Sequence, residues 1–369
     1  MKILIATGIY PPDIGGPATM LGALAKSLEE NGFEIRILTY SDIVSKDGEK
    51  IFRIGRGHYL KYFLKILRLS KWAEIVYVTD TYSVGYFAYL IKKFTGKKYI
   101  VRFAGDSAWE TAFNRGLTKD DILNFQEKTY GRFIKKLKKR RTKILQSADA
   151  VIAVSDFMKK LAGKLGVSSE KTRTIYNAID FFDSIPQYRE PTSPTLVFSG
   201  RLTPWKGLQM LLELVSSLKQ KYPNIVFEIV GDGPEMDNLK SLSRQLNIEK
   251  NVNFRGRISE SESHLVFANS TIFVLNTNYE GLSHAVLNAL NVGLPVIITP
   301  AGGNPEVIQD GYNGLLAPYN DKEAWFKAIT RLLDDRSLRE KFSINGKQTL
   351  EKFKWSELVE KTIDVFNSI

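Results

Sequence analysis

The sequence has no cysteine and only 3 histidines among its 369 residues. Without thiolates the chain can build neither a disulfide framework nor a cysteine-ligated metal site, which is consistent with a reducing compartment. The histidines, His58, His264 and His284, do not have the spacing of metal ligands, and no Asp-x-Asp pair occurs. We therefore expect no metal ion and no cofactor.

Long apolar runs are also missing. No run approaches the ~18–20 residues that a helix needs to cross a bilayer. The N-terminal stretch MKILIATGIYPP has one lysine and a short apolar run, with prolines and glycines close behind, so it predicts a buried first strand rather than a signal peptide. We expect a cytoplasmic protein that is soluble or attached to the inner face of a membrane without spanning it.

Acidic residues are fewer than basic ones: the sequence has 40 Asp and Glu and 52 Lys and Arg, which gives a net charge of +12. Such an excess indicates an anionic partner: nucleic acid, anionic lipid or a phosphorylated ligand. Two basic stretches, Tyr59–Trp72 and Arg132–Lys143, are candidates for helices that lie on an anionic membrane surface, or else for solvated helix faces. No helix-turn-helix, zinc or RNP pattern supports nucleic acid, so we expect no nucleic-acid partner.

The runs that are present are short and rich in valine and isoleucine, such as KILIAT, EIRILTY, TLVFSGR and STIFVLNT, and they alternate with helical patterns. This alternation predicts parallel sheets covered on both faces. Because single cores stop growing at about 250–300 residues, we predict an α/β protein of two doubly wound domains, residues 1–185 and 186–354. Three prolines between 181 and 195 mark the division. Two such domains facing each other would hold a ligand in a cleft beyond the carboxyl ends of their strands.

The turn after the first strand contains Gly15 and Gly16, and a helical pattern follows. Glycine lets the backbone approach an anion, and a helix N-terminus offers free N–H groups to it; the alternative is an ordinary strand-to-helix turn. The G-x-G-x-x-G fingerprint and the G-x-x-x-x-G-K-[ST] loop are both absent, which argues against a dehydrogenase and against a P-loop enzyme.

Two motifs in the second half carry charge at strand ends. Arg201 and Lys206 follow TLVFSG, where a guanidinium and an ammonium can grip a diphosphate, although both could be solvated surface charges. Glu280 lies in the turn after STIFVLNT, and Ser283 is a plausible N-cap of a helix that carries Asn288. Both polar groups could face a ligand at that helix N-terminus; otherwise they are an ordinary first-turn acid and a helix-surface amide.

Taken together, the motifs resemble glycosyltransferase family 4, the retaining GT-B glycosyltransferases of group 1. The resemblance covers nearly the whole chain. It rests on YPPDIGGPATML, RFAGDSAWE and TIYNAID in the first half and on GRLTPWKG, VGDGP, NFRGRIS, YEGLSHAVLNALNVGLPVI and GGNPEVIQDGYNGLL in the second.

The resemblance implies a GT-B-like pair of Rossmann-like domains, with a final helix, residues 355–369, that crosses back to the first domain. It also implies a nucleotide-sugar donor bound mainly by the second domain. Arg201 and Lys206 match the diphosphate-binding pair, and Glu280 matches the first acid of the E-x7-E motif, which contacts the donor sugar. The remaining donor-binding positions that it implies are Gly15, Gly16, Gly256, Arg257, Ile258, Gly281, Leu282, Ser283 and Asn288.

Two positions depart from the family pattern. Asn288 stands where the second acid of E-x7-E usually accepts hydrogen bonds from the ribose hydroxyls. Gly105 stands where many relatives have a histidine before the aspartate. We take Asp106 as a catalytic candidate and Glu110 as an acceptor-side candidate.

The implied reaction is transfer of a hexosyl group, with retention, from a UDP- or GDP-linked sugar to a glycan or lipid-linked acceptor, in cell-surface polysaccharide or glycolipid synthesis. Two alternatives remain open at this point. One is a nucleotide-sugar epimerase on the same scaffold, and the other is a donor-binding subunit with weak activity.

Overall fold

The computed structural model describes residues 1–13, 15–41, 49–179 and 186–369. These residues form two compact units: Met1–Tyr176 together with Ser356–Ile369, and Asn177–Trp355. The predicted boundary between the two domains, after residue 185, borders residues 180–185, which the structure does not describe. This boundary therefore stays a prediction.

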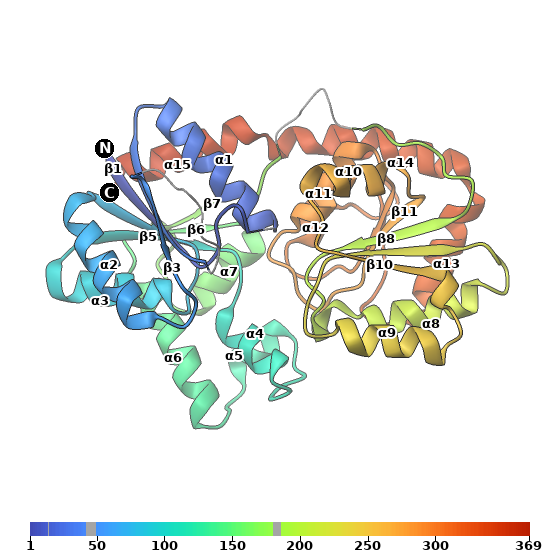
Figure 1. Cartoon of the computed structure of the whole chain (residues 1–369), viewed down its shortest axis with the longest axis horizontal. Helices are drawn as coiled ribbons and strands as arrows, with labels where there is room; N and C mark the ends of the chain where they lie inside the picture. The colour runs from blue at the N-terminus through green and yellow to red at the C-terminus, as the bar shows by residue number, and fades with distance from the viewer. Residues whose placement is uncertain (14, 42–48, 180–185) are drawn as a thin grey trace. The chain divides into compact units, whose positions relative to one another are not determined.

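The described part of the first unit is built on a parallel sheet of seven strands in the order β3-β2-β1-β4-β5-β6-β7 (Figure 1). The strands are β1 Lys2–Thr7, β2 Glu34–Tyr40, β3 Ile51–Ile54, β4 Ile75–Val78, β5 Lys98–Phe103, β6 Ala150–Ala153 and β7 Thr172–Thr174. The helices are α1 Gly16–Glu30, α2 Tyr59–Trp72, α3 Val84–Thr95, α4 Ser107–Asn114, α5 Ile122–Glu127, α6 Arg132–Ser147, α7 Asp156–Lys164 and α15 Trp355–Asn367, with a 3-10 turn η1 at Ser169–Lys171.

Central strands of this sheet are buried along their whole length: every residue of β4 and of β6 is buried. This explains their unbroken apolar sequences, since a parallel sheet is covered on both faces. The helix α15 completes the same core from the far end of the sequence. Its Phe366 is fully buried, with its ring centroid 5.9 Å from that of Phe33 and 5.8 Å from that of Tyr77.

The described part of the second unit has a six-stranded parallel sheet in the order β10-β9-β8-β11-β12-β13 (Figure 1). The strands are β8 Thr195–Ser199, β9 Val226–Val230, β10 Val252–Gly256, β11 Ile272–Leu275, β12 Val296–Ile298 and β13 Leu315–Leu316. The helices are α8 Leu208–Leu218, α9 Met236–Gln245, α10 Glu260–Ala268, α11 His284–Val292, α12 Asn304–Val307, α13 Lys322–Asp334 and α14 Arg336–Thr349, with 3-10 turns η2 Pro204–Lys206, η3 Glu249–Asn251 and η4 Leu350–Phe353.

Both sheets are doubly wound. In each, the first strand of the unit lies inside the sheet, and the chain proceeds outward from it first on one side and then on the other. The strand order therefore reverses between β1 and β4 in the first unit and between β8 and β11 in the second. The predicted fold class, two doubly wound parallel-sheet α/β domains, is confirmed.

Candidate functional site

The loop after β8 presents two cations at the carboxyl edge of the second unit's sheet. Arg201 is exposed and, within the described ranges, has no ion-pair partner. Lys206 ends the η2 turn and is largely buried, with 9% of its surface exposed. This loop and the loop after β11 flank the point where the strand order reverses, and doubly wound sheets bind their ligands at such a point.

The loop after β11 brings Glu280 to Lys206. The ammonium of Lys206 forms an ion pair with Glu280 Oε2, and the two side chains are 11% and 20% exposed. Their motifs place these residues at different parts of the donor and do not predict their direct contact. Because the pair is partly withdrawn from water, each charge needs either its partner or a ligand in its place.

The backbone of Glu280 is held by the loop after β12. Gly303 N donates to the carbonyl oxygen of Glu280 over 3.0 Å. The neighbouring Gly302 has φ +61°, and a Cβ there would lie 1.7 Å from that oxygen. Only glycine fits this position, which explains Gly302, the first glycine of the GGNPE segment.

The helix α11 begins directly after the loop that carries Glu280. Ser283 is its N-cap and accepts a hydrogen bond from Val286 N over 3.4 Å. Gly281 and Leu282 before it are buried, and the carbonyl of Leu282 accepts a hydrogen bond from Asn177 Nδ2 over 2.7 Å. Asn288 lies one turn along the helix from His284 and is half-buried.

The end of β10 lies at the same edge, two strands from β8. The carbonyl of Gly256 accepts a hydrogen bond from Gly231 N over 2.8 Å, so this turn is fixed against the loop after β9. Arg257 Nε lies 3.3 Å from Asp232 Oδ2, and Ile258 is half-buried. The second unit therefore brings together the predicted residues after β8, β10 and β11 along one edge of its sheet. Their contacts to a donor stay predictions.

The two glycines of the first unit lie after β1. Gly15 has φ 148° and precedes α1, whose first residue is Gly16. The helix has no side-chain cap and no acidic residue in its first turn, and a proline occupies one of its first two positions. Its N-terminal N–H groups are suited to an anion, and phosphate binding there stays a prediction.

Asp106 has a structural role that its motif, RFAGDSAWE, does not indicate. It is fully buried and caps α4, accepting hydrogen bonds from Ala108 N at 3.0 Å and Trp109 N at 3.3 Å. Its other oxygen accepts from Gln126 Nε2 at 2.9 Å and forms a buried ion pair with Arg141. With both oxygens occupied inside the protein, the geometry argues against the catalytic role expected for Asp106. Glu110, in the first turn of the same helix, is half-buried.

The basic stretch of α6 is divided between an inner and an outer face. Lys138, Arg140 and Arg141 turn inward: the Lys138 ammonium lies 2.7 Å from the carbonyl oxygen of Phe125, and the Arg140 guanidinium lies 3.7 Å from the ring centroid of Tyr86. Burial lowers the pKa of Lys138. The exposed basic residues of α6 are Arg132, Lys135, Lys136, Lys139 and Lys143. Their spacing places them on one side of the helix, and we call this set the α6 basic stripe.

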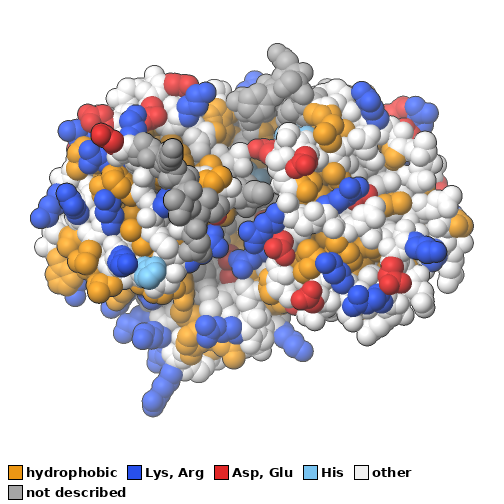
Figure 2. All heavy atoms as spheres, in the orientation of Figure 1, with side chains coloured by type: hydrophobic (Ala, Val, Ile, Leu, Met, Phe, Trp, Pro, Cys, Tyr) orange, Lys and Arg blue, Asp and Glu red, His pale blue; other side chains and the backbone are white. Residues whose placement is uncertain are grey.

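The other basic stretch, α2, exposes apolar as well as basic side chains. Tyr59, Leu60 and Leu64 are exposed by 53%, 71% and 56%, with Lys61 and Arg68 also exposed. Figure 2 shows lysine and arginine side chains over the part of the first unit where α2 and α6 lie. Among the described residues, no helix is both long enough and apolar enough to span a membrane.

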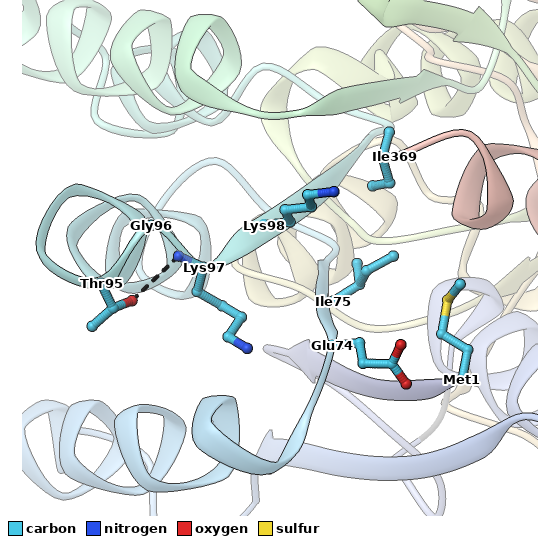
Figure 3. Close-up of a pocket in the computed structure, with 8 residues that line it drawn as sticks. All are labelled: Met1, Glu74, Ile75, Thr95, Gly96, Lys97, Lys98 and Ile369. Atoms are coloured by element: carbon cyan, nitrogen blue, oxygen red, sulfur yellow. Dashed lines mark hydrogen bonds between the residues drawn. The ribbon is translucent and has the colours of Figure 1, made fainter.

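A cavity of about 370 Å³ lies in the first unit, away from these loops (Figure 3). Its lining includes Glu74 and Ile75 at the start of β4 and Lys97 and Lys98 at the start of β5. It therefore opens at the amino ends of the strands, the opposite edge from the one where doubly wound sheets bind ligands. In the described part of the chain, no group of three or more His, Cys, Asp or Glu residues could hold a metal ion.

Comparison with known proteins gives the chain its family. Residues 180–349 match the family "Glycosyl transferases group 1", and residues 14–181 match "Glycosyltransferase Family 4". An uncharacterized glycosyltransferase of Methanocaldococcus jannaschii is 25% identical over 99% of this chain and 98% of its own length. The GDP-mannose-dependent alpha-(1-6)-phosphatidylinositol monomannoside mannosyltransferase of Mycobacterium tuberculosis is 27% identical over 48% of each protein.

A solved structure with the same fold is that of Anabaena HepE in complex with UDP-glucose. It has a TM-score of 0.80 and 17% sequence identity, covering 100% of both chains. The two family matches together include most of both units. The chain belongs to the group 1 glycosyltransferases, glycosyltransferase family 4, as its motifs predicted.

Proposed function

We propose that the protein is a retaining hexosyltransferase that uses a UDP- or GDP-linked sugar. The observation that carries the proposal is the ion pair of Lys206 with Glu280 at the switch point of the second sheet, where the loop that holds Lys206 also carries Arg201. Two cations beside a carboxylate suit a ligand with a diphosphate at one end and hydroxyl groups at the other. Relatives support both nucleotides, since HepE was crystallised with UDP-glucose and the mycobacterial mannosyltransferase is named for GDP-mannose.

In the proposed reaction the bond between C1 of the sugar and the diphosphate oxygen breaks, and its electrons leave with the diphosphate. Arg201, Lys206 and the N–H groups at the start of α11 stabilise the growing negative charge. The acceptor hydroxyl attacks C1 from the face that the diphosphate leaves and gives its proton to a departing phosphate oxygen. This route needs neither a protein nucleophile nor a metal ion, and Glu280 would hold the sugar hydroxyls.

The proposed acceptor is a glycan or a lipid-linked sugar, in polysaccharide or glycolipid synthesis on the cytoplasmic face of a membrane. The name of the mycobacterial relative, which includes a phosphatidylinositol mannoside, supports a lipid-linked acceptor. The first unit is the proposed acceptor side, with Glu110 as a candidate acceptor contact. The turn of Gly15 and Gly16 is instead a proposed contact to the phosphate groups of the donor.

Donor turnover with and without a lipid-linked acceptor tests the proposal. Transfer requires the acceptor, whereas an epimerase converts the donor without one and a donor-binding subunit does neither. Screening nucleotide sugars by thermal shift identifies the donor for this assay. Epimerised donor in the absence of acceptor, or binding without any turnover, would contradict the proposed transfer.

Replacing Asn288 by glutamate should tighten nucleotide binding. A neutral amide accepts hydrogen bonds worth about 1 kcal/mol, whereas bonds to a charged group are worth roughly 1.5–3 kcal/mol. If the ribose hydroxyls lie against this position, Asn288→Glu lowers the Kd of the nucleoside diphosphate about 3- to 10-fold, measured by calorimetry. Asn288→Gln, which adds length without charge, is the control and should not tighten binding. An unchanged Kd in Asn288→Glu would place the ribose elsewhere.

The α6 basic stripe and the exposed face of α2 are the proposed membrane-facing surface. Each lysine or arginine near an anionic bilayer contributes about 1 kcal/mol, and salt screens this attraction. We expect the protein to sediment with vesicles that contain phosphatidylserine, to release as salt rises, and to bind neutral vesicles weakly. The double variant Lys135→Glu/Lys139→Glu should reduce anionic binding at least 10-fold.

The matched control reverses two exposed lysines of the second unit, Lys250→Glu and Lys341→Glu. It makes the same change in net charge but leaves the α6 basic stripe intact, so its vesicle binding should stay within about 3-fold of wild type. Equal losses in the two double variants would mean that net charge alone drives binding. If the protein binds neither kind of vesicle, the α6 basic stripe is a solvated helix face and not a membrane-binding surface.

A further inference from the structure

The residues on either side of Lys206 each accept a hydrogen bond through their backbone carbonyl, and no sequence motif indicated these two bonds. The carbonyl of Trp205 accepts a hydrogen bond from Asn278 N over 2.8 Å. The carbonyl of Gly207 accepts one from the side-chain Nδ2 of Asn276 over 3.0 Å. Both donors come from the loop after β11 that carries Glu280. The loop that carries Lys206 and the loop that carries Glu280 are thus hydrogen-bonded to each other on both sides of Lys206.

The side chain of Asn276 can both donate and accept hydrogen bonds, and its position requires both. It is fully buried, and its second N–H donates to Asn320 Oδ1 over 2.8 Å. Its oxygen accepts a hydrogen bond from Asn320 N over 3.0 Å. The orientation of the amide is fixed, because the carbonyl of Gly207 requires a donor and the N–H of Asn320 requires an acceptor. Aspartate lacks the donor, and leucine lacks both groups.

The contact between the amide and the loop is also tight. Gly207 has φ +53°, and a Cβ at this position would lie 2.2 Å from Asn276 Nδ2. Gly207 is also the residue that precedes α8. The amide therefore packs directly against the backbone next to Lys206, and any shift of one displaces the other.

We propose that Asn276 is a positioning residue that sets where the Lys206 ammonium stands relative to the donor diphosphate. The proposal rests on the proposed function of this site. Lysine has a long flexible side chain, so the direction of its charge depends on how firmly its backbone is anchored. A displacement of about 1 Å at a catalytic group can cost on the order of 100-fold in rate.

The test replaces Asn276 by leucine, which is of similar size and removes both hydrogen-bonding groups. We expect kcat to fall about 10- to 100-fold, while the Kd of the nucleoside diphosphate rises only about 3- to 10-fold, because the misplaced charge matters most in the transition state. If the leucine variant does not fold, Asn276→Asp serves instead, since it keeps the acceptor for Asn320 N and loses the donor to Gly207.

The matched control is another buried asparagine of the same unit. Asn251 is 6% exposed and donates to the carbonyl of Ile225 over 2.8 Å, at the amino end of β10. Asn251→Leu removes two side-chain hydrogen bonds, to the carbonyls of Pro223 and Ile225, away from the site. It should lower the melting temperature about as much as Asn276→Leu does, and leave kcat within about 3-fold of wild type. Equal loss of kcat in both variants would mean that Asn276 acts through stability alone.

A double-mutant cycle with Lys206→Ala decides whether Asn276 acts through Lys206. If it does, Asn276→Leu changes kcat and the diphosphate Kd less than 2-fold once Lys206 is absent. Independent, multiplying effects would overturn the inference. The Kd arm of the cycle needs no transfer activity. If the wild-type protein is inactive with every donor, the proposed function is wrong. Non-additive effects of the two substitutions on the diphosphate Kd would still show that Asn276 positions Lys206 for an anion.

Discussion

Lys206→Ala should lower kcat about 100-fold or more and leave the melting temperature within a few degrees of wild type. The expected loss is large because the ammonium faces negative charge that develops mainly as the sugar leaves the diphosphate. The fold should tolerate the change because Lys206 lies in a strand-end loop rather than within the sheet, and because water can reach the remaining Glu280 carboxylate, which is already 20% exposed, once the lysine side chain is removed. Single-turnover kinetics separates this loss of chemistry from a loss of donor binding.

Arg201→Ala should show a similar loss, since the exposed guanidinium is the second cation of the proposed diphosphate grip. The control is Lys250→Ala, which removes an exposed lysine from the η3 turn of the same unit and should keep full activity. Activity within a few-fold of wild type in Lys206→Ala and in Arg201→Ala, at unchanged melting temperature, would remove both residues from the diphosphate site.

Glu280→Gln should remove most of the activity and yet preserve, or tighten, binding of the nucleoside diphosphate alone. The ion pair between Lys206 and Glu280 occupies the ammonium before any ligand arrives. A neutral glutamine releases that ammonium for phosphate, so the Kd should stay equal or fall up to about 10-fold. The sugar loses a charged acceptor at the same time, and charge-assisted hydrogen bonds are about twice as strong as neutral ones. We expect kcat to fall about 100-fold.

Calorimetry with the diphosphate and turnover with the whole donor report these two effects separately. Glu213→Gln is the matched control, because Glu213 is exposed on α8 and its ion pair with Lys322 lies at the surface. It should change neither quantity. Weaker diphosphate binding in Glu280→Gln would mean that Glu280 supports the loop structurally, and full activity would exclude it from the sugar site.

Much of the fold could be predicted from the sequence because central parallel strands are apolar throughout. KILIAT and EIRILTY coincide with β1 and β2, residue for residue. Two strands that no such apolar run predicts, β3 and β13, lie at sheet edges. In β3 every residue is only partly buried, and β13 has two residues. An edge strand has one neighbour and less burial, so its sequence carries a weaker signal.

The contacts of the site were harder to predict, because they join residues far apart in the chain. Lys206 and Glu280 are separated by 74 positions, and Asp106 and Arg141 by 35. Motif position indicated that the first two lie near a ligand, but gave no information on their ion pair. Charge counting treated Arg141 as one more exposed base of Arg132–Lys143, although its guanidinium is buried with Asp106. The sequence did not indicate a role for Asn276 in the site, because asparagine is common in the turns that follow strands.

The return of α15 to the first unit also has a consequence for how the protein is made. Domains generally fold as units in the order in which the ribosome releases them. Here the whole of Asn177–Trp355 is synthesised before Ser356–Ile369, whose Phe366 fills the core between Phe33 and Tyr77. The unit that begins first can therefore close its core only after the second unit has left the ribosome. Until then its unfilled apolar surface is open to chaperones.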